Sequence, residues 1–65
     1  MFNKNKFMAL LKENDISIEQ LAGIIGVSKT TLYRKINGES DFYRSEIQAI
    51  ATVVPNAKIE TIFFA

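Results

Sequence analysis

Apolar residues recur every three or four positions along most of the chain, which is the spacing of helices that bury one face. This pattern predicts helices over about residues 4–13, 17–25, 28–37, 44–54 and 57–63. The positions expected to face inward are Phe7, Leu10, Leu11, Leu21, Ile24, Ile25, Leu32, Ile36, Ile47, Ile50, Ala51 and Val54. Short apolar runs fit helical spacing better than the alternation of a strand. The sequence therefore predicts an all-α fold, a compact five-helix bundle in a single domain over residues 1–65.

The stretch between the second and third helices predicts a sharp turn. Ser17 and Gln20 have the spacing of a capping box, in which two side chains satisfy free amides at the start of a helix. Gly26 stands where a left-handed residue is expected, and Val27 fills the angle between the helices. Ser28 is suited to cap the third helix. Two short helices joined in this way form a helix-turn-helix motif.

Further residues mark the ends of the other helices. Asn14 and Asp15 end the first helix, because both tolerate the left-handed conformation. Pro55 ends the fourth helix, and Asn56 is suited to cap the last one. Gly23 lies inside the second helix, where glycine costs about 1 kcal/mol relative to alanine. It is either a surface glycine or a point of close approach to a backbone or to DNA.

The composition excludes several kinds of site. The chain has 65 residues with no Cys and no His, so disulfides and the usual zinc ligands are absent. The acids do not follow a calcium-loop pattern, and we expect no metal and no cofactor. No apolar run approaches the roughly 20 residues that cross a membrane. Because no secretory signal is evident either, we expect a cytoplasmic protein.

The net charge is only +1, but the cations are unevenly placed. Lys29, Arg34 and Lys35 lie in a stretch without acids, which predicts a small basic face on the third helix. Lys35 lies near the inward side, so its stem is expected to be buried with its ammonium at the surface. A solvated basic face is the alternative interpretation of these charges. The preceding helix and turn favour binding to DNA.

The outward face of the third helix carries side chains that meet DNA. Threonine hydrogen-bonds base edges or contacts the thymine methyl group, and Lys and Arg pair with guanine or phosphate. Since the first turn of a recognition helix reaches deepest into the groove, we expect bases to be read by Lys29, Thr30, Thr31 and Tyr33. Residues at the cap and further along the helix are expected to bind phosphate: Ser28, Arg34 and Asn37.

We expect no enzymatic activity. The hydroxyls of Ser28, Thr30 and Thr31 have no histidine to activate them as nucleophiles. The chain also lacks a glycine-rich phosphate loop.

The C-terminal helix has more large apolar residues than one side can bury. Ile62 or Phe63 is expected to complete the core, but Phe64 falls about 100° from Phe63 around a helix. An exposed remainder indicates a surface for self-association. We therefore expect a homodimer, at least on DNA, formed through Ile59, Ile62, Phe63 and Phe64.

The chain resembles the lambda-repressor-like, Cro/cI-type (XRE) helix-turn-helix family. The matching elements are Leu21-Ala22, Ile25-Gly26-Val27-Ser28, Leu32, Asn37-Gly38 and Glu46-Ile47. The resemblance implies a five-helix bundle that binds the major groove as a dimer and represses transcription. The run from Thr31 to Gly38 is similar to small regulators of Gram-positive phages and mobile elements. The chain departs from many members at Ile18, where they carry a phosphate-contacting glutamine.

Two hypotheses of function follow. The first is a sequence-specific regulator that binds a double-stranded DNA operator, with no membrane or small-molecule partner. The alternative is a helix-turn-helix module that binds a protein, such as an antitoxin. The basic and hydroxyl side chains of the third helix favour DNA, since an apolar outer face would have favoured protein.

Overall fold

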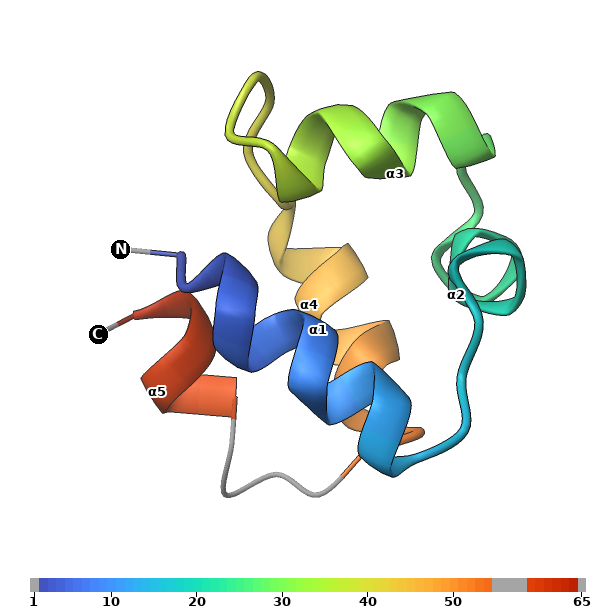
Figure 1. Cartoon of the computed structure of the whole chain (residues 1–65). Coiled ribbons are helices and arrows are strands. Elements are labelled where there is room, and N and C mark those ends of the chain that lie inside the picture. The colour runs from blue at the N-terminus through green and yellow to red at the C-terminus, as the bar shows by residue number, and fades with distance from the viewer. Residues whose placement is uncertain (1, 55–58, 65) are drawn as a thin grey trace.

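The computed structural model describes residues 2–54 and 59–64, and this part of the chain is helical without strands. The helices are α1 (Lys4–Glu13), α2 (Ile18–Ile25), α3 (Lys29–Ile36), α4 (Arg44–Ala51) and α5 (Ile59–Phe63) (Figure 1). The all-α five-helix fold is thus confirmed. None of these helices is long and apolar enough to cross a membrane.

The expected helix ends are confirmed at most positions. Ser17 and Gln20 form the capping box of α2, with Ser17 Oγ accepting the Gln20 amide at 3.0 Å. Asp15 after α1, Gly26 after α2 and Gly38 after α3 adopt positive φ angles.

The α4 helix is shorter than expected, ending at Ala51 rather than at Val54. The chain tightens there, because the amides of Thr52 and Val53 each bond to the carbonyl three residues earlier. The expected roles of Pro55 and Asn56, and the start of the last helix at residue 57, lie outside the described residues.

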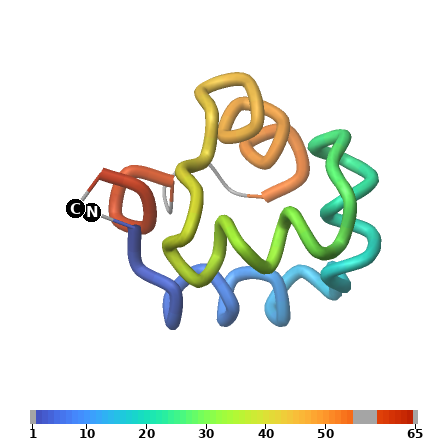
Figure 2. The backbone as a smooth tube through the Cα atoms, turned by 90° about the horizontal axis from the view of Figure 1, so that it is seen from above, coloured from blue at the N-terminus to red at the C-terminus, as the bar shows by residue number. Residues whose placement is uncertain are grey.

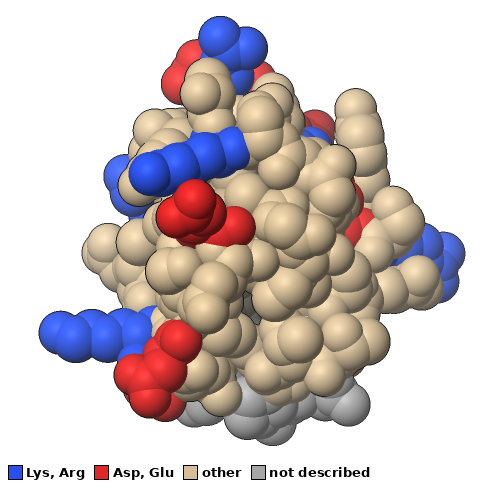
Figure 3. Space-filling model, turned by 90° about the vertical axis from the view of Figure 1, so that its right-hand side faces the viewer, with Lys and Arg blue, Asp and Glu red and all other residues tan. Residues whose placement is uncertain are grey.

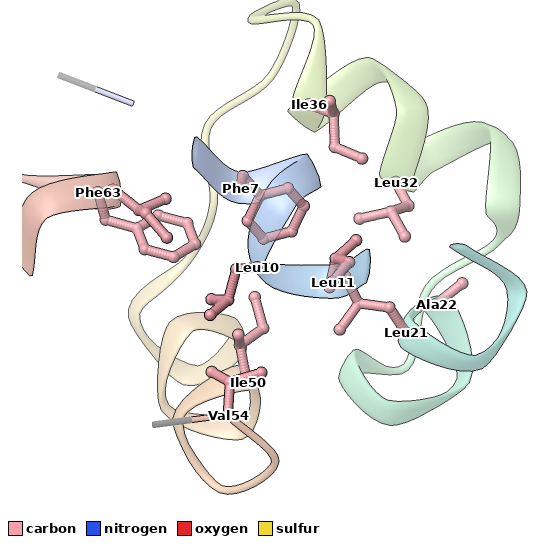
Figure 4. Packing of buried hydrophobic residues seen from close by; sticks show 11 residues of the cluster. Phe7, Leu10, Leu11, Leu21, Ala22, Leu32, Ile36, Ile50, Val54 and Phe63 are labelled. Carbon is pink, nitrogen blue, oxygen red and sulfur yellow. The ribbon is translucent and has the colours of Figure 1, made fainter. Parts of the chain in front are cut away.

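The hydrophobic core draws on every helix. Figure 4 shows its side chains converging between the helices, and the buried residues are Phe7, Leu10, Leu11, Leu21, Ala22, Leu32, Ile36, Ile50, Val54, Ile62 and Phe63. The expectation that Ile24 faces inward is wrong, since 39% of this residue is exposed. The inward stripe of α2 instead runs through Ile18, Leu21, Ala22 and Ile25, the spacing of one helix face.

An aromatic cluster closes one end of the bundle. The rings of Phe2, Phe7, Phe42 and Phe63 contact one another in pairs, with centroids 5.1 to 5.9 Å apart. Their tilted and edge-on arrangements are the ones that the charge distribution of aromatic rings favours. The cluster joins the N-terminal segment, α1, the loop before α4 and α5. It therefore holds the two described ends of the chain together.

Candidate nucleic-acid interface

The turn between α2 and α3 is built by local contacts. Gly26 is left-handed, with φ of 79°, and its amide donates to the Ala22 carbonyl at 2.9 Å. The Val27 amide donates to the same carbonyl at 3.0 Å, while its half-buried side chain packs against the core. Ser28 then caps α3. The chain thus reverses within three residues, and α3 lies along the outer edge of the molecule (Figure 1).

The α3 helix has one buried and one exposed face, as its sequence predicts. Leu32 and Ile36 are buried in the core. The exposed residues include most of the expected DNA-contacting set: Ser28, Lys29, Thr30, Tyr33, Arg34 and Asn37. Tyr33 is 44% exposed although it is aromatic. The tertiary structure therefore gathers these side chains on one accessible surface, which we call the α3 face.

Two hydroxyl groups at the start of α3 are already engaged with each other. Ser28 Oγ accepts the Thr31 amide at 3.1 Å and donates to Thr31 Oγ1 at 2.9 Å. Thr31 is half-buried, unlike Thr30. A phosphate contact donated by the Ser28 hydroxyl therefore requires its bond to Thr31 to be exchanged. In the first turn of α3, Lys29 and Thr30 are more directly available to DNA than Ser28 and Thr31 are.

Lys35 belongs to the interior, so the expectation of an ammonium at the surface is wrong. The residue is 4% exposed, and its Nζ lies 3.0 Å from Glu46 Oε1. The same Nζ donates to the Asp41 carbonyl at 3.0 Å and lies 4.2 Å from the centre of the Tyr43 ring. Glu46 also accepts the Tyr43 amide at 2.7 Å. This network ties the end of α3 to the start of α4.

Sequence reasoning missed Glu46, although a signal for it was present. Lys35 shares an inward helix face with Leu32 and Ile36, three residues before it and one after it. A lysine at such a position needs a buried acid as partner. Pairing with Glu46 also means that Lys35 does not contribute an exposed charge to the α3 face.

On one side of the molecule, the cations do not form a continuous patch. On the side of the molecule seen in Figure 3, Lys and Arg side chains stand apart, and acidic side chains lie close to several of them. Within residues 2–54 and 59–64, Lys35 and Glu46 form the one ion pair. Lys29 and Arg34 are exposed on α3, and neither has a carboxylate partner in the described part of the chain. Positive charge at this site is therefore local, in keeping with the small net charge of +1.

Three residues of α2 were considered for contact with DNA, and the structure gives two of them a role within the protein. Gln20 is held in the capping box, since its Oε1 accepts the Ser17 amide at 2.9 Å. Ile18 is half-buried against the core. Gly23 is exposed, and a Cβ atom added there would meet nothing within 4 Å. Within the chain, the interpretation as a surface glycine is supported.

The four residues expected to form a dimer surface divide into two groups. Ile62 is 1% exposed and Phe63 is 8% exposed, so both belong to the core and offer no surface to a second copy. The expectation that Ile62 and Phe63 belong to a dimer surface is therefore wrong, because α5 packs against α1 with these two residues inward. Phe64 is 66% exposed and Ile59 is half-buried. Phe64 lines an open groove together with Phe42 and Ile47.

The described residues contain no cluster of three or more acidic, cysteine or histidine side chains that could hold a metal ion. The site is therefore a surface of cations, hydroxyls and an amide on one helix.

Comparison with known families supports the interpretation of this surface as a nucleic-acid interface. A family model described as the Cro/C1-type HTH DNA-binding domain matches residues 6–54, which contain the turn and the whole α3 face. Comparisons with curated proteins and with solved structures gave no significant match.

Proposed function

The chain belongs to the Cro/C1-type HTH DNA-binding domain family, and on this premise we propose that it is a sequence-specific transcriptional regulator. It acts as a Cro/cI-like repressor of the kind encoded by prophages, inserting α3 into the major groove of an operator. The observation that carries this proposal is the α3 face, whose exposed side chains are polar or cationic while Leu32 and Ile36 hold the helix on the core. No acid lies on α3 to repel phosphate.

The contacts divide along α3. Lys29 and Thr30 lie in the first turn, which reaches deepest into the groove, and Tyr33 follows one turn later on the same face. We assign base reading to these residues, with Thr31 contributing when its bond to Ser28 opens. Arg34 and Asn37 lie toward the end of the helix and bind the phosphate backbone. The protein then represses transcription by blocking polymerase at the operator.

A second copy of the chain completes the binding unit. One small module gives weak specific binding, whereas a two-fold dimer reads two half-sites about 34–36 Å apart. The exposed Phe64 and the half-buried Ile59 are the residues of α5 that remain accessible for this contact. The Phe64 groove supplies further apolar surface to bury.

Selection of bound duplexes from random DNA by the purified protein tests the proposal. We expect enrichment of a motif with two-fold symmetry and a half-site spacing of about one helical turn. An asymmetric motif would support DNA reading but contradict the dimer. Absence of enrichment over random DNA would overturn the proposed function and favour the module that binds a protein partner.

Thr30→Ala is expected to change base preference. The substitution removes a hydroxyl and a methyl group from the first turn of α3, where base edges are read. Discrimination at one base position should fall by about 1–3 kcal/mol, while binding to random DNA stays unchanged. Competition binding to operators that differ at single positions measures this effect. Equal losses on every duplex would remove Thr30 from the base-reading set.

Arg34→Ala is expected to weaken binding to all duplexes alike, because phosphate carries no sequence information. The slope of log K against log salt concentration should become shallower by about 0.9, the value for one phosphate contact. Binding titrations between low and moderate salt measure the slope. An unchanged slope would contradict the phosphate assignment of Arg34.

A further inference from the structure

The first turn of α1 meets the end of α3. Lys4 Nζ donates to Asn37 Oδ1 at 2.9 Å, although 33 positions separate the two residues along the chain. Both residues are exposed. Seen from above in Figure 2, α1 and α3 run in opposite directions, and both Figures 1 and 2 place the N-terminal end of α1 toward the C-terminal end of α3. The ammonium of Lys4 therefore stands at the edge of the α3 face.

This position gives the α3 face a cation that α3 itself does not supply. Of the three cations on α3, Lys35 is buried and paired with Glu46. Lys29 and Arg34 remain exposed, and they lie on different turns of the helix. Lys4 is also without a carboxylate partner among the described residues. Its charge is thus available to an anion beyond the protein.

The hydrogen bond leaves donors free on both partners. An ammonium has three donors, so one is used by Asn37 and two remain. The Asn37 carboxamide accepts through Oδ1, and its two Nδ2 hydrogens remain available. Oriented as a pair, these groups match the oxygens of a phosphodiester, which accept hydrogen bonds from ammonium and amide donors.

We propose that Lys4 is a phosphate-binding residue, and that the DNA interface extends from α3 onto the first turn of α1. This inference rests on the proposed function. A helix in the major groove lies between two sugar-phosphate backbones, and the groove is about 12 Å wide. With the first turn of α3 deepest, its C-terminal end approaches one backbone. Lys4 and Asn37 bind the same stretch of that backbone, one from each helix.

The salt dependence of binding by Lys4→Ala tests this inference. The slope of log K against log salt concentration should become shallower by about 0.9, as expected for one lost phosphate contact. Affinity near moderate salt should fall by roughly five- to tenfold, equally for the selected operator and for a random duplex. Thermal unfolding by circular dichroism checks that the variant retains the fold.

Two matched variants sharpen the experiment. Lys4→Arg keeps the charge and the donors, and we expect it to retain the slope of the unmodified protein. Lys12→Ala removes an exposed lysine from the last turn of the same helix. Figure 1 shows that this end of α1 descends away from α3. Lys12→Ala should therefore leave the slope unchanged.

Two results with the variants would overturn the inference. An unchanged slope in Lys4→Ala, even with reduced affinity, would mean that Lys4 orients Asn37 without meeting phosphate. An equal loss in Lys12→Ala would mean that the effect is one of net charge. Failure of the unmodified protein to bind any duplex would instead contradict the proposed function, and this is measured before any variant is compared.

Discussion

Glu46→Ala is expected to lower the free energy of unfolding by about 3–5 kcal/mol, because it leaves the buried ammonium of Lys35 without its counter-charge. The substitution also removes the acceptor for the Tyr43 amide at the start of α4. A domain of this length has a total stability of roughly 3–10 kcal/mol. The loss is therefore a large fraction of the total, and the variant should unfold at much lower urea. Urea denaturation followed by circular dichroism measures the loss.

A double variant separates the charge from the packing. In Lys35→Met with Glu46→Gln, the methionine replaces most of the lysine stem, and the glutamine keeps an acceptor for the Tyr43 amide. Replacing both members of a buried ion pair is often neutral, whereas breaking it is costly. We expect the double variant to recover most of the lost stability. A double variant as unstable as Glu46→Ala would show that the ion pair is not the cause.

Phe7→Ala is expected to cost about 3–5 kcal/mol, the range for removing a fully buried phenylalanine. Phe7 is 0% exposed, and its ring contacts those of Phe2, Phe42 and Phe63. The cavity would lie where the N-terminal segment, α5 and the loop before α4 meet. These segments should loosen together, so unfolding should remain cooperative but occur at lower urea. Chemical denaturation and amide hydrogen exchange measure the effect.

Phe64→Ala provides the control for Phe7→Ala. It deletes the same atoms from a side chain that is 66% exposed. Measured at dilutions where the protein is monomeric, its stability should change by less than about 0.5 kcal/mol. Equal losses in the two variants would contradict the described core. A loss below about 1 kcal/mol in Phe7→Ala would show that the cluster repacks around the cavity.

The helix-turn-helix could be predicted from the sequence because its determinants are local. The Ser17–Gln20 capping box, the left-handed Gly26 and the Ser28 cap each act within a few residues of the chain. Such contacts form once the backbone enters a helix, whatever lies further away. The inward face of α3 could be predicted from the helical spacing of its apolar residues, because the helix packs against the core on one side.

The inward face of α2 was harder to predict. The α2 helix packs against both α3 and α4, and Ile24 fits an apolar stripe as well as Ile25 does on sequence alone. Which of them is buried depends on the rotation of α2 between its two neighbours. The structure buries Leu21 and Ala22 and leaves Ile24 exposed. The same argument applies to α5, where packing against α1 decided that Ile62 and Phe63 face inward.

The amino-acid sequence was enough to predict that five helices form, that Ser17 and Ser28 cap two of them, and that the outer face of α3 is polar, because these features depend on contacts within about one turn or on periodicity. Three contacts became evident only in the folded chain: the pairing of Lys35 with Glu46, the hydrogen bond of Lys4 to Asn37, and the packing of Phe42 against other aromatic rings. These contacts join segments whose separation is fixed by how the helices pack. No local pattern specifies which distant charge or ring a side chain will meet.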